Sequence, residues 1–293
     1  MRPLRIKPEG MDCWYHCCNR ISGRPGDTPL GRADKEAFLS IVRRLSRLYT
    51  IRVCAFMVMD NHVHLLVRVP GSLPSPDDVL RRYSAYHHGN RHLDPHGPQV
   101  VQWQERLRDI SAFMGQLERM FTLWYNRQHG RRGCLWGGRF RSSLLEAGES
   151  LWRCWKYIEC NPIRAGIVKR AADYRFGSFG AWFMRGTHVF NEEFSADLFP
   201  AMREYLGVQT ESDLMTRMAA ALSEAGDPSA PAIVRTQCMR RLRYWTDGLV
   251  IGSEMFIRKI MSEYGNPSDR RLYQPEDAGS LCWHPLRRVP AAT

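Results

Sequence analysis

The 293-residue sequence contains no apolar run near the roughly 18 residues that cross a membrane. Its first 18 residues, MRPLRIKPEGMDCWYHCC, also lack the apolar stretch of 7–15 residues that is typical of a signal peptide. These two absences predict a cytoplasmic protein with no membrane partner. The hydrophobic fraction of 44% excludes an intrinsically disordered chain, because it is enough to fill a core.

The nine cysteines form no regular framework. An odd number at irregular spacing argues against a secreted disulfide scaffold. Cys13, Cys17 and Cys18 stand near His16, and these four side chains suggest a zinc cluster as one interpretation. No second Cys/His pair follows at a matching spacing, so the pattern favours reduced thiols packed in strands and helices.

Lysine is scarce, with five residues among the 42 basic ones, and acidic residues are scarce in the first part of the chain. Residues 1–185 carry 30 Lys and Arg against 16 Asp and Glu, whereas residues 186–293 carry 12 against 14. Arginine grips phosphate in two places and stacks on bases, so this charge indicates a polyanionic partner, most simply nucleic acid. A GC-rich genome, which favours arginine codons, is the alternative explanation.

Hydrophobic periodicity and turn residues predict an α+β fold. The expected strands cover 12–20, 51–59, 62–69 and the end of 130–145; the expected helices cover 33–48, 77–88, 103–127, 151–161, 164–169, 195–225 and 253–264. This order is typical of a ferredoxin-like split β-α-β fold, an antiparallel sheet with helices on one face. The other face is then open for a site.

Alternation in the strand 62–69 separates two sets of side chains. Val63, Leu65, Val67 and Val69 point to a core, whereas His62 and His64 point to the other face. Two histidines side by side on a strand offer a pair of nitrogen ligands to a divalent metal. The alternative is two histidines on a solvated sheet face.

Tyr157 and Asn161 are four residues apart and therefore share one face of the helix expected there. A tyrosine hydroxyl can attack phosphorus and form a covalent phosphotyrosine, and an asparagine amide oxygen can complete the coordination of a metal beside it. A tyrosine packed in an amphipathic helix is the alternative.

Residues 135–141 (LWGGRFR) combine groups that suit a nucleic acid. The glycines allow close approach of the backbone, Arg139 and Arg141 suit phosphates, and Trp136 and Phe140 offer rings for stacking on bases. A basic hairpin tip is the alternative.

Together, residues 60–66 (DNHVHLL), 136–140 (WGGRF) and 157–168 (YIECNPIRAGIV) resemble the single-tyrosine HUH transposases, and within them the REP-associated tyrosine transposases. Residues 15–20 and 173–179 fit the same family, so the resemblance covers about residues 10–185. It implies an HUH transposase/nuclease domain over 1–185, followed by a mostly helical extension over 186–293. Residues 244–256 look like a tail found on some members.

The resemblance implies roles for individual residues. His62 and His64 are the expected metal ligands, Asn161 the third, polar ligand, and Tyr157 the nucleophile. Mg²⁺ or Mn²⁺ is the expected ion. Single-stranded DNA beside a hairpin is the expected substrate, with Arg20, Arg139, Arg141 and Trp136 as candidate DNA contacts. Such a protein is nucleoid-associated when bound to DNA, and works as a monomer or a homodimer.

Three functions follow from these residues. The first is a DNA transposase/endonuclease that cleaves and rejoins strands through a 5′-phosphotyrosine. The second is a domesticated hairpin-DNA binder with little turnover, although such a binder has no need of an intact His62, His64, Tyr157 and Asn161. The third is a metallohydrolase that uses water as its nucleophile. The chain contains no GxxxxGK[ST] motif, which argues against a replication initiator with its own helicase.

Overall fold

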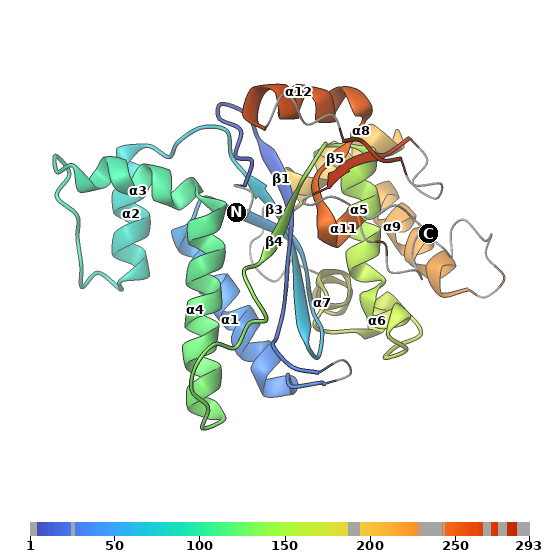
Figure 1. The fold of residues 1–293 in the computed structure, drawn as a ribbon, viewed down its shortest axis with the longest axis horizontal. Coiled ribbons are helices and arrows are strands. Elements are labelled where there is room, and N and C mark those ends of the chain that lie inside the picture. The colour runs from blue at the N-terminus through green and yellow to red at the C-terminus, as the bar shows by residue number, and fades with distance from the viewer. Residues whose placement is uncertain are drawn as a thin grey trace.

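The computed structural model describes residues 5–24, 27–186, 194–227, 229, 242, 244–265, 271–274 and 280–285. Six strands of these residues form one sheet in the order β2-β3-β1-β4-β5-β6 (Figure 1). Their bounds are β1 Cys13–Arg20, β2 Arg52–Val58, β3 His62–Val69, β4 Arg141–Leu145, β5 Gly248–Gly252 and β6 Cys282–Pro285. Neighbouring strands are antiparallel except β4 and β5, which are parallel.

Helices make up most of the remaining described chain. Their bounds are α1 Arg32–Leu48, α2 Pro76–Tyr86, α3 Gln99–Arg108, α4 Ile110–Gln128, α5 Glu149–Glu159, α6 Asn161–Arg164, α7 Ser178–Arg185, α8 Phe194–Leu206, α9 Glu211–Gly226, α11 Tyr244–Asp247 and α12 Glu254–Tyr264. None of the helices in the described ranges is both long enough and apolar enough to span a bilayer.

The first four strands have the topology predicted from the sequence. α1 connects β1 to β2, and β3 returns between these two strands, so that the order β2-β3-β1-β4 is that of a ferredoxin-like split β-α-β unit. The predicted α+β class is therefore confirmed. Two further strands extend the sheet beyond β4, and both come from the C-terminal part of the chain.

Helices cover both faces of the sheet, so the expectation of helices on one face and an open second face is wrong. Figure 1 shows α1 and α4 on one side, and α5, α7 and α11 on the other. The register explains the alternation: Cys17 lies opposite Leu65, and Cys18 lies opposite His64. Because alternate residues point to opposite faces, the histidines of β3 lie on the face that α5 covers, where His64 is buried and His62 is partly exposed.

Three helices differ from the sequence prediction. The one expected over 195–225 is two helices, α8 and α9, separated by residues 207–210. The helix expected over 103–127 is interrupted at Asp109, whose side chain accepts hydrogen bonds from the main-chain N–H groups of Ser111 (2.5 Å) and Ala112 (3.1 Å) and so begins α4. The short helix expected over 164–169 lies earlier, as α6. Pro162 stands in its first turn, where its missing N–H costs no helical hydrogen bond, and Gly166 ends the turn with φ +69°.

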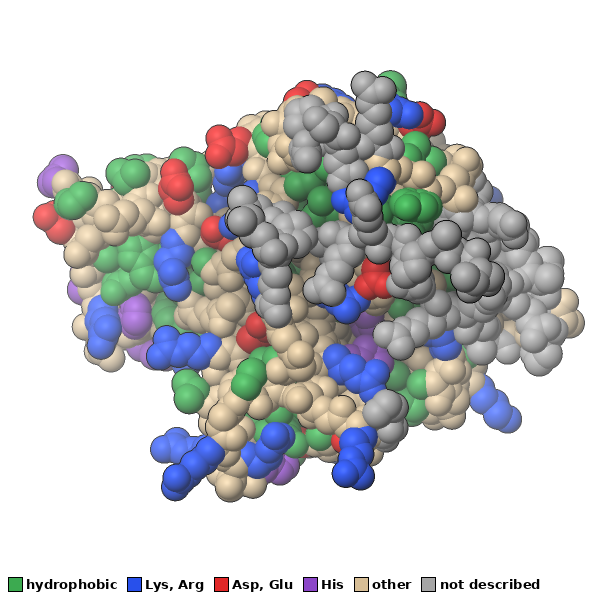
Figure 2. Space-filling view, viewed as in Figure 1, with side chains coloured by type: hydrophobic (Ala, Val, Ile, Leu, Met, Phe, Trp, Pro, Cys, Tyr) green, Lys and Arg blue, Asp and Glu red, His purple; other side chains and the backbone are tan. Residues whose placement is uncertain are grey.

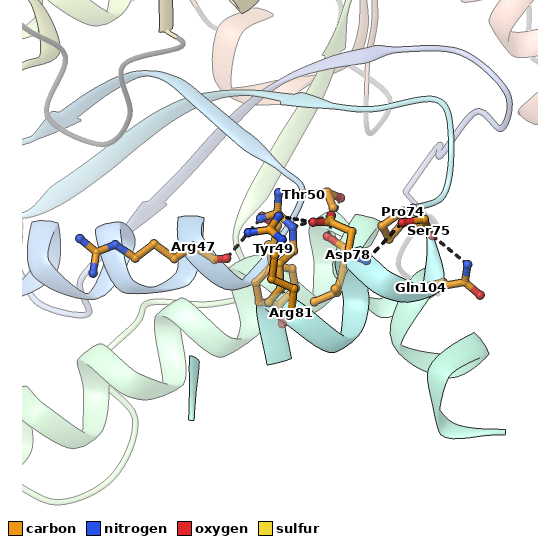
Figure 3. A network of polar contacts seen from close by, with 10 residues as sticks. Arg47, Tyr49, Thr50, Pro74, Ser75, Asp78, Arg81 and Gln104 are labelled. Atoms are coloured by element: carbon orange, nitrogen blue, oxygen red, sulfur yellow. Dashed lines mark hydrogen bonds and ion pairs between the residues drawn. The ribbon is translucent and has the colours of Figure 1, made fainter. Parts of the chain in front are cut away.

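A polar network fastens α2 and α3 to the end of α1 (Figure 3). The Arg82 guanidinium donates to the carbonyls of Arg47 (3.2 Å) and Tyr49 (3.0 Å) and to the Asp78 carboxylate (2.7 Å). Gln104 donates to the carbonyl of Pro74 at 2.8 Å. The bonds from Arg82 satisfy main-chain carbonyls that α1 leaves unpaired at its end, and the bond from Gln104 joins α3 to the segment before α2.

The C-terminal part of the chain continues the sheet of the first part. Leu144 and Leu145 of β4 pair with Val250 and Ile251 of β5. The division into domains at residues 185 and 186 remains a prediction from the family resemblance and the change in charge. The shared sheet means that residues after 244 lie beside the strands that carry the predicted site.

Candidate active site

Three histidines gather on the sheet face that α5 covers. His62 and His64 stand on β3 with ring centroids 5.1 Å apart, and the ring of His16 on β1 lies 5.0 Å from that of His64, with an angle of 12° between the two ring planes. His16 and His64 are almost completely buried, whereas His62 is partly exposed. The predicted pair therefore lies on one face, and His16 adds a third imidazole.

A chain of hydrogen bonds runs through two of these rings. His16 Nε2 lies 2.8 Å from His64 Nδ1, and His16 Nδ1 lies 2.9 Å from the main-chain oxygen of Trp245. Burial disfavours the imidazolium form and lowers the pKa of His16 to about 4, although the bond to the Trp245 carbonyl opposes the shift. His16 is consequently neutral at physiological pH.

Tyr157 reaches the same cluster from α5. Its ring centroid lies 5.9 Å from that of His64 and 6.1 Å from that of His16, with both histidines edge-on to it. α5 buries the side that carries Leu151, Cys154, Tyr157 and Ile158, as its amphipathic pattern predicts. The tyrosine and the histidine pair, almost 100 residues apart in sequence, are thus neighbours in space.

Trp245 of α11 covers the cluster. Its ring lies 5.8 Å from Tyr157 and 6.5 Å from His16, and Tyr157 is only 3% exposed. α11 is held against β4 by Arg141, which forms an ion pair with Asp247 and donates to the carbonyl of Thr246 at 3.3 Å. The Ser143 hydroxyl donates to the carbonyl of Gly248, the first residue of β5, at 2.7 Å and so fixes the end of α11 as well. The C-terminal part of the chain therefore supplies one wall of the site.

Asn161 follows Tyr157 by one helical turn, as predicted. Its amide nitrogen donates to the carbonyls of Tyr157 (3.0 Å) and Ile158 (3.1 Å) at the end of α5. Its amide oxygen accepts a hydrogen bond of 2.6 Å from Arg164, whose guanidinium also lies 4.5 Å from the centroid of the Tyr157 ring. Arg164 thus links the predicted nucleophile to the predicted third ligand.

The hydrogen bonds around His62 favour the ring tautomer that can bind a divalent metal. Asn61 Nδ2 donates to the carbonyl of Asp27 (2.8 Å), which orients the amide so that its oxygen accepts from His62 Nδ1 (2.7 Å). In the neutral ring, Nε2 is then the unprotonated nitrogen, the form that binds a metal. Within the described ranges, no three His, Cys, Asp or Glu side chains form a metal-binding group, so further ligands would be amide, phosphate or water oxygens.

The cysteines near His16 do not join it in a cluster. Cys17 points to the opposite face of β1, and Cys13, Cys17 and Cys18 are buried thiols that form no disulfide. The zinc interpretation is therefore wrong for these side chains, and the packed-thiol interpretation holds.

The four predicted DNA contacts have different surroundings. Arg20 and Arg139 are exposed, and Arg141, also exposed, is bonded to Asp247 and to the carbonyl of Thr246 (3.3 Å). Trp136 is only 6% exposed and packs on Phe38 and Phe121, so the expectation that it offers a ring to bases is not met.

The surface around Arg20 and Arg139 is rich in arginine. Figure 2 shows Lys and Arg side chains gathered along the lower edge of that view, where α4 ends and the chain turns toward β4. The exposed basic residues of these segments are Arg20, Arg24, Arg127, Arg131, Arg132 and Arg139. This edge carries the positive charge that indicated a polyanionic partner.

Sequence reasoning missed three residues of the cluster. Alternation along 13–20 places His16 on the face of Cys18, which pairs with His64, so strand periodicity contained a signal for it. Arg164 follows Tyr157 by seven residues, or two helical turns. Trp245 lies within a stretch noted as a possible tail, but nothing local in the sequence indicates its position over Tyr157.

No protein-family model and no curated protein matches the chain. Among solved structures, the chain is similar to a REP-associated tyrosine transposase bound to a REP hairpin, with 17% sequence identity and a TM-score of 0.43. The similarity covers 64% of this chain and 87% of the other. The family of that solved protein is the one that the sequence motifs resemble.

Proposed function

We propose that this protein is a metal-dependent transposase/endonuclease that cleaves and rejoins single-stranded DNA through a 5′-phosphotyrosine on Tyr157. The observation that carries the proposal is the meeting of Tyr157 with the histidine pair, at 5.9 Å between the Tyr157 and His64 rings. A tyrosine from α5 thus lies beside two imidazoles of β3 that could hold a metal, and a hydroxyl nucleophile beside a metal is what the proposed phosphoryl transfer to a side chain needs.

His62 and His64, through Nε2, would hold Mg²⁺ or Mn²⁺, with the amide oxygen of Asn161 as the proposed third ligand. When bound, such an ion stabilises negative charge on the phosphate undergoing transfer. Arg164 contacts both Asn161 and the Tyr157 ring, so the same guanidinium orients these two side chains and adds positive charge beside the phenol.

Tyr157 supplies the nucleophile. Its phenol oxygen loses its proton and forms a bond to phosphorus, the bond from phosphorus to the 3′ oxygen breaks, and that oxygen gains a proton. The products are a 5′-phosphotyrosine and a free 3′-hydroxyl. Because one phosphodiester replaces another, attack by a second 3′-hydroxyl reverses the step and joins a new strand without ATP.

Exposed arginines along the lower edge of Figure 2 would bind the phosphate backbone, with Arg20 and Arg139 as the predicted contacts. Binding of this kind is independent of base sequence and weakens as salt rises. A hairpin next to the cleavage site is proposed from the motif resemblance, and Arg141 joins the contacts in a state in which Asp247 releases it.

A hairpin-DNA binder with little turnover is the second candidate. The burial of Tyr157 under Trp245 favours it, since the hydroxyl of a 3% exposed side chain does not meet a scissile phosphate in this arrangement. The two candidates share the DNA surface and differ in whether Tyr157 becomes covalently attached.

The decisive experiment uses labelled single-stranded DNA from the flanks of the protein's own gene, with Mg²⁺ or Mn²⁺, resolved on a denaturing gel. Tyr157→Phe removes the phenol oxygen and is expected to abolish a protein–DNA adduct. Tyr125→Phe is the matched control, because Tyr125 is also a buried helical tyrosine, 4% exposed, but packs on the other side of the sheet.

An adduct that Tyr125→Phe keeps and Tyr157→Phe loses supports the transposase. Metal-dependent cleavage without an adduct, unchanged in Tyr157→Phe, would instead identify a hydrolase that uses water. Tight binding of the flanking DNA with neither product would identify the binder.

A further inference from the structure

We propose that His16 is a positioning residue: it accepts a hydrogen bond from His64 and thereby fixes the tautomer in which His64 Nε2 is the metal-binding nitrogen. The main-chain carbonyl of Trp245 sets the direction of this bond. The part of the proposal that concerns the metal rests on the proposed function. The tautomer itself is a property of the chain alone.

The direction follows from the chemistry of the partners. A main-chain carbonyl only accepts hydrogen bonds, so His16 Nδ1, 2.9 Å from the Trp245 oxygen, carries a proton. His16 is 1% exposed, and burial favours its neutral ring. A neutral ring with a proton on Nδ1 has an unprotonated Nε2, so this atom accepts from His64 Nδ1 at 2.8 Å.

The consequence for His64 is a defined tautomer. With its proton on Nδ1, the neutral His64 ring carries its lone pair on Nε2. The opposite tautomer would place two lone pairs against each other across the 2.8 Å contact, which removes the hydrogen bond. The arrangement also fixes the plane of the His64 ring, which is within 12° of the plane of the His16 ring, as a hydrogen bond between two ring nitrogens favours.

Asn61 and Asp27 favour the same tautomer for His62. Asn61 accepts from His62 Nδ1, and the Asp27 carbonyl orients the Asn61 amide. The two predicted ligands thus present the same nitrogen by different means. For His62 the orienting group is the preceding residue, whereas for His64 it is a chain of two groups that ends 229 residues from His16. This agreement is what a two-histidine metal site needs, because bonds to the second ring nitrogen orient the ligand.

The first test measures the tautomer in full-length, metal-free and DNA-free protein. Nitrogen-15 NMR of histidine-labelled protein distinguishes protonated from unprotonated ring nitrogens. We expect His64 of the wild-type protein to carry its proton on Nδ1. A proton on Nε2 of His64 would overturn the proposal, and this measurement needs no variant to fold.

The second test compares three variants by the same spectra and by Mn²⁺ titration calorimetry. His16→Leu removes the acceptor and should mix the His64 tautomers and weaken Mn²⁺ binding about 10- to 100-fold. His16→Gln offers an amide oxygen as acceptor and should restore most of both. Cys18→Ala, a buried change directly opposite His64 on the same face, should leave both unchanged.

Wild-type tautomer and Mn²⁺ affinity in His16→Leu would overturn the proposal, as would equal losses in His16→Leu and Cys18→Ala, which would indicate a packing effect. Failure of the proposed function is separate: it appears as the absence of a Tyr157 adduct in the wild-type protein and does not alter the tautomer spectra.

Discussion

The two faces of the sheet use the same strands for different purposes. On the face covered by α4, Leu65 and Cys17 are buried in a core, and Asn19 donates to the Glu118 carboxyl of α4 at 2.6 Å. On the face covered by α5, the same strands present His16 and His64. The comparison teaches that a two-residue period separates the side chains that hold the fold from those that would carry chemistry.

The faces also differ in where their polar groups find partners. On the α4 face, Arg5 donates to Ser142 (3.0 Å) and to the carbonyl of Phe140 (2.7 Å), so the N-terminal segment holds the loop before β4. On the α5 face, the histidine chain ends on Trp245, which belongs to the last part of the chain. The site is therefore assembled from both ends of the sequence, whereas the α4 face needs residues 5–145.

The largest expected difference between the faces is in stability. Leu65→Ala deletes a completely buried side chain and should lower the free energy of unfolding by about 2–5 kcal/mol. His62→Ala, at a partly exposed position on the other face, should change it by about 0.5 kcal/mol or less while abolishing Mn²⁺ binding. Urea denaturation and calorimetry check the pair. Similar losses of stability in both variants would break the comparison.

The next effect concerns Glu159, a completely buried residue of α5. Burial raises the pKa of Glu159 to about 8, while hydrogen bonds from Ser178 and the Phe179 N–H oppose the shift. Among the described residues, its Oε2 has no hydrogen-bond partner. The folded state therefore holds a proton that the unfolded chain, with the usual value of 4.5, releases.

The proton held by Glu159 in the folded state determines how the free energy of unfolding changes with pH. Because the folded state binds it more tightly, the free energy of unfolding is highest below pH 4.5 and falls as the pH rises from 4.5 to 8. Glu159→Gln should remove this fall and stabilise the protein by about 2 kcal/mol at pH 8, with little effect at pH 4. Thermal melts across that range test it, with Glu204→Gln at an exposed position as the control. A stabilisation that is constant with pH would contradict the assignment.

The smallest expected effect is at Glu118, a partly buried carboxyl on the α4 face. Burial raises the pKa of Glu118 to about 7, against the opposing bond from Asn19 and the charge of Arg5. Because the pKa of Glu118 is also raised in the folded state, its contribution to the free energy of unfolding falls as the pH rises from 4.5 to 7. Glu118 is partly exposed, so Glu118→Gln should gain about 1 kcal/mol at pH 8 in the same melts. A larger stabilisation at pH 8 in Glu118→Gln than in Glu159→Gln would contradict the prediction that the carboxyl on α5 has the larger effect.

Local patterns predicted much of this arrangement. Alternation along 62–69 gave the correct faces for His62 and Leu65, because a strand has a fixed period of two. The spacing of Tyr157 and Asn161 placed them one helical turn apart. The break at Asp109 was missed in the helix predicted over 103–127, although aspartate is a favoured residue just before a helix.

Such local patterns do not predict which distant segments of the chain pack or pair with each other. A sheet face can be open or covered with the same alternation, and α5 covers this one because its own apolar side must be buried. Trp136 lies between glycines that suggested an exposed loop, yet its ring fills space between α1 and α4. Trp245 reaches His16 through the parallel pairing of β4 and β5, and no periodicity in the sequence encodes which strand accepts β5.

The parallel pairing of β4 and β5 has a consequence for synthesis of the chain. A ribosome makes His62, His64 and Tyr157 well before it makes Trp245, so the nascent protein carries these residues while the wall formed by α11 does not yet exist. At about 5–20 residues per second, that interval lasts for several seconds. During this interval, α5 can pack on its face of the sheet, while His16 Nδ1 still lacks the Trp245 carbonyl as its hydrogen-bond acceptor. Emergence of α11 from the ribosome, rather than folding of the first four strands, is then the event that closes the cluster.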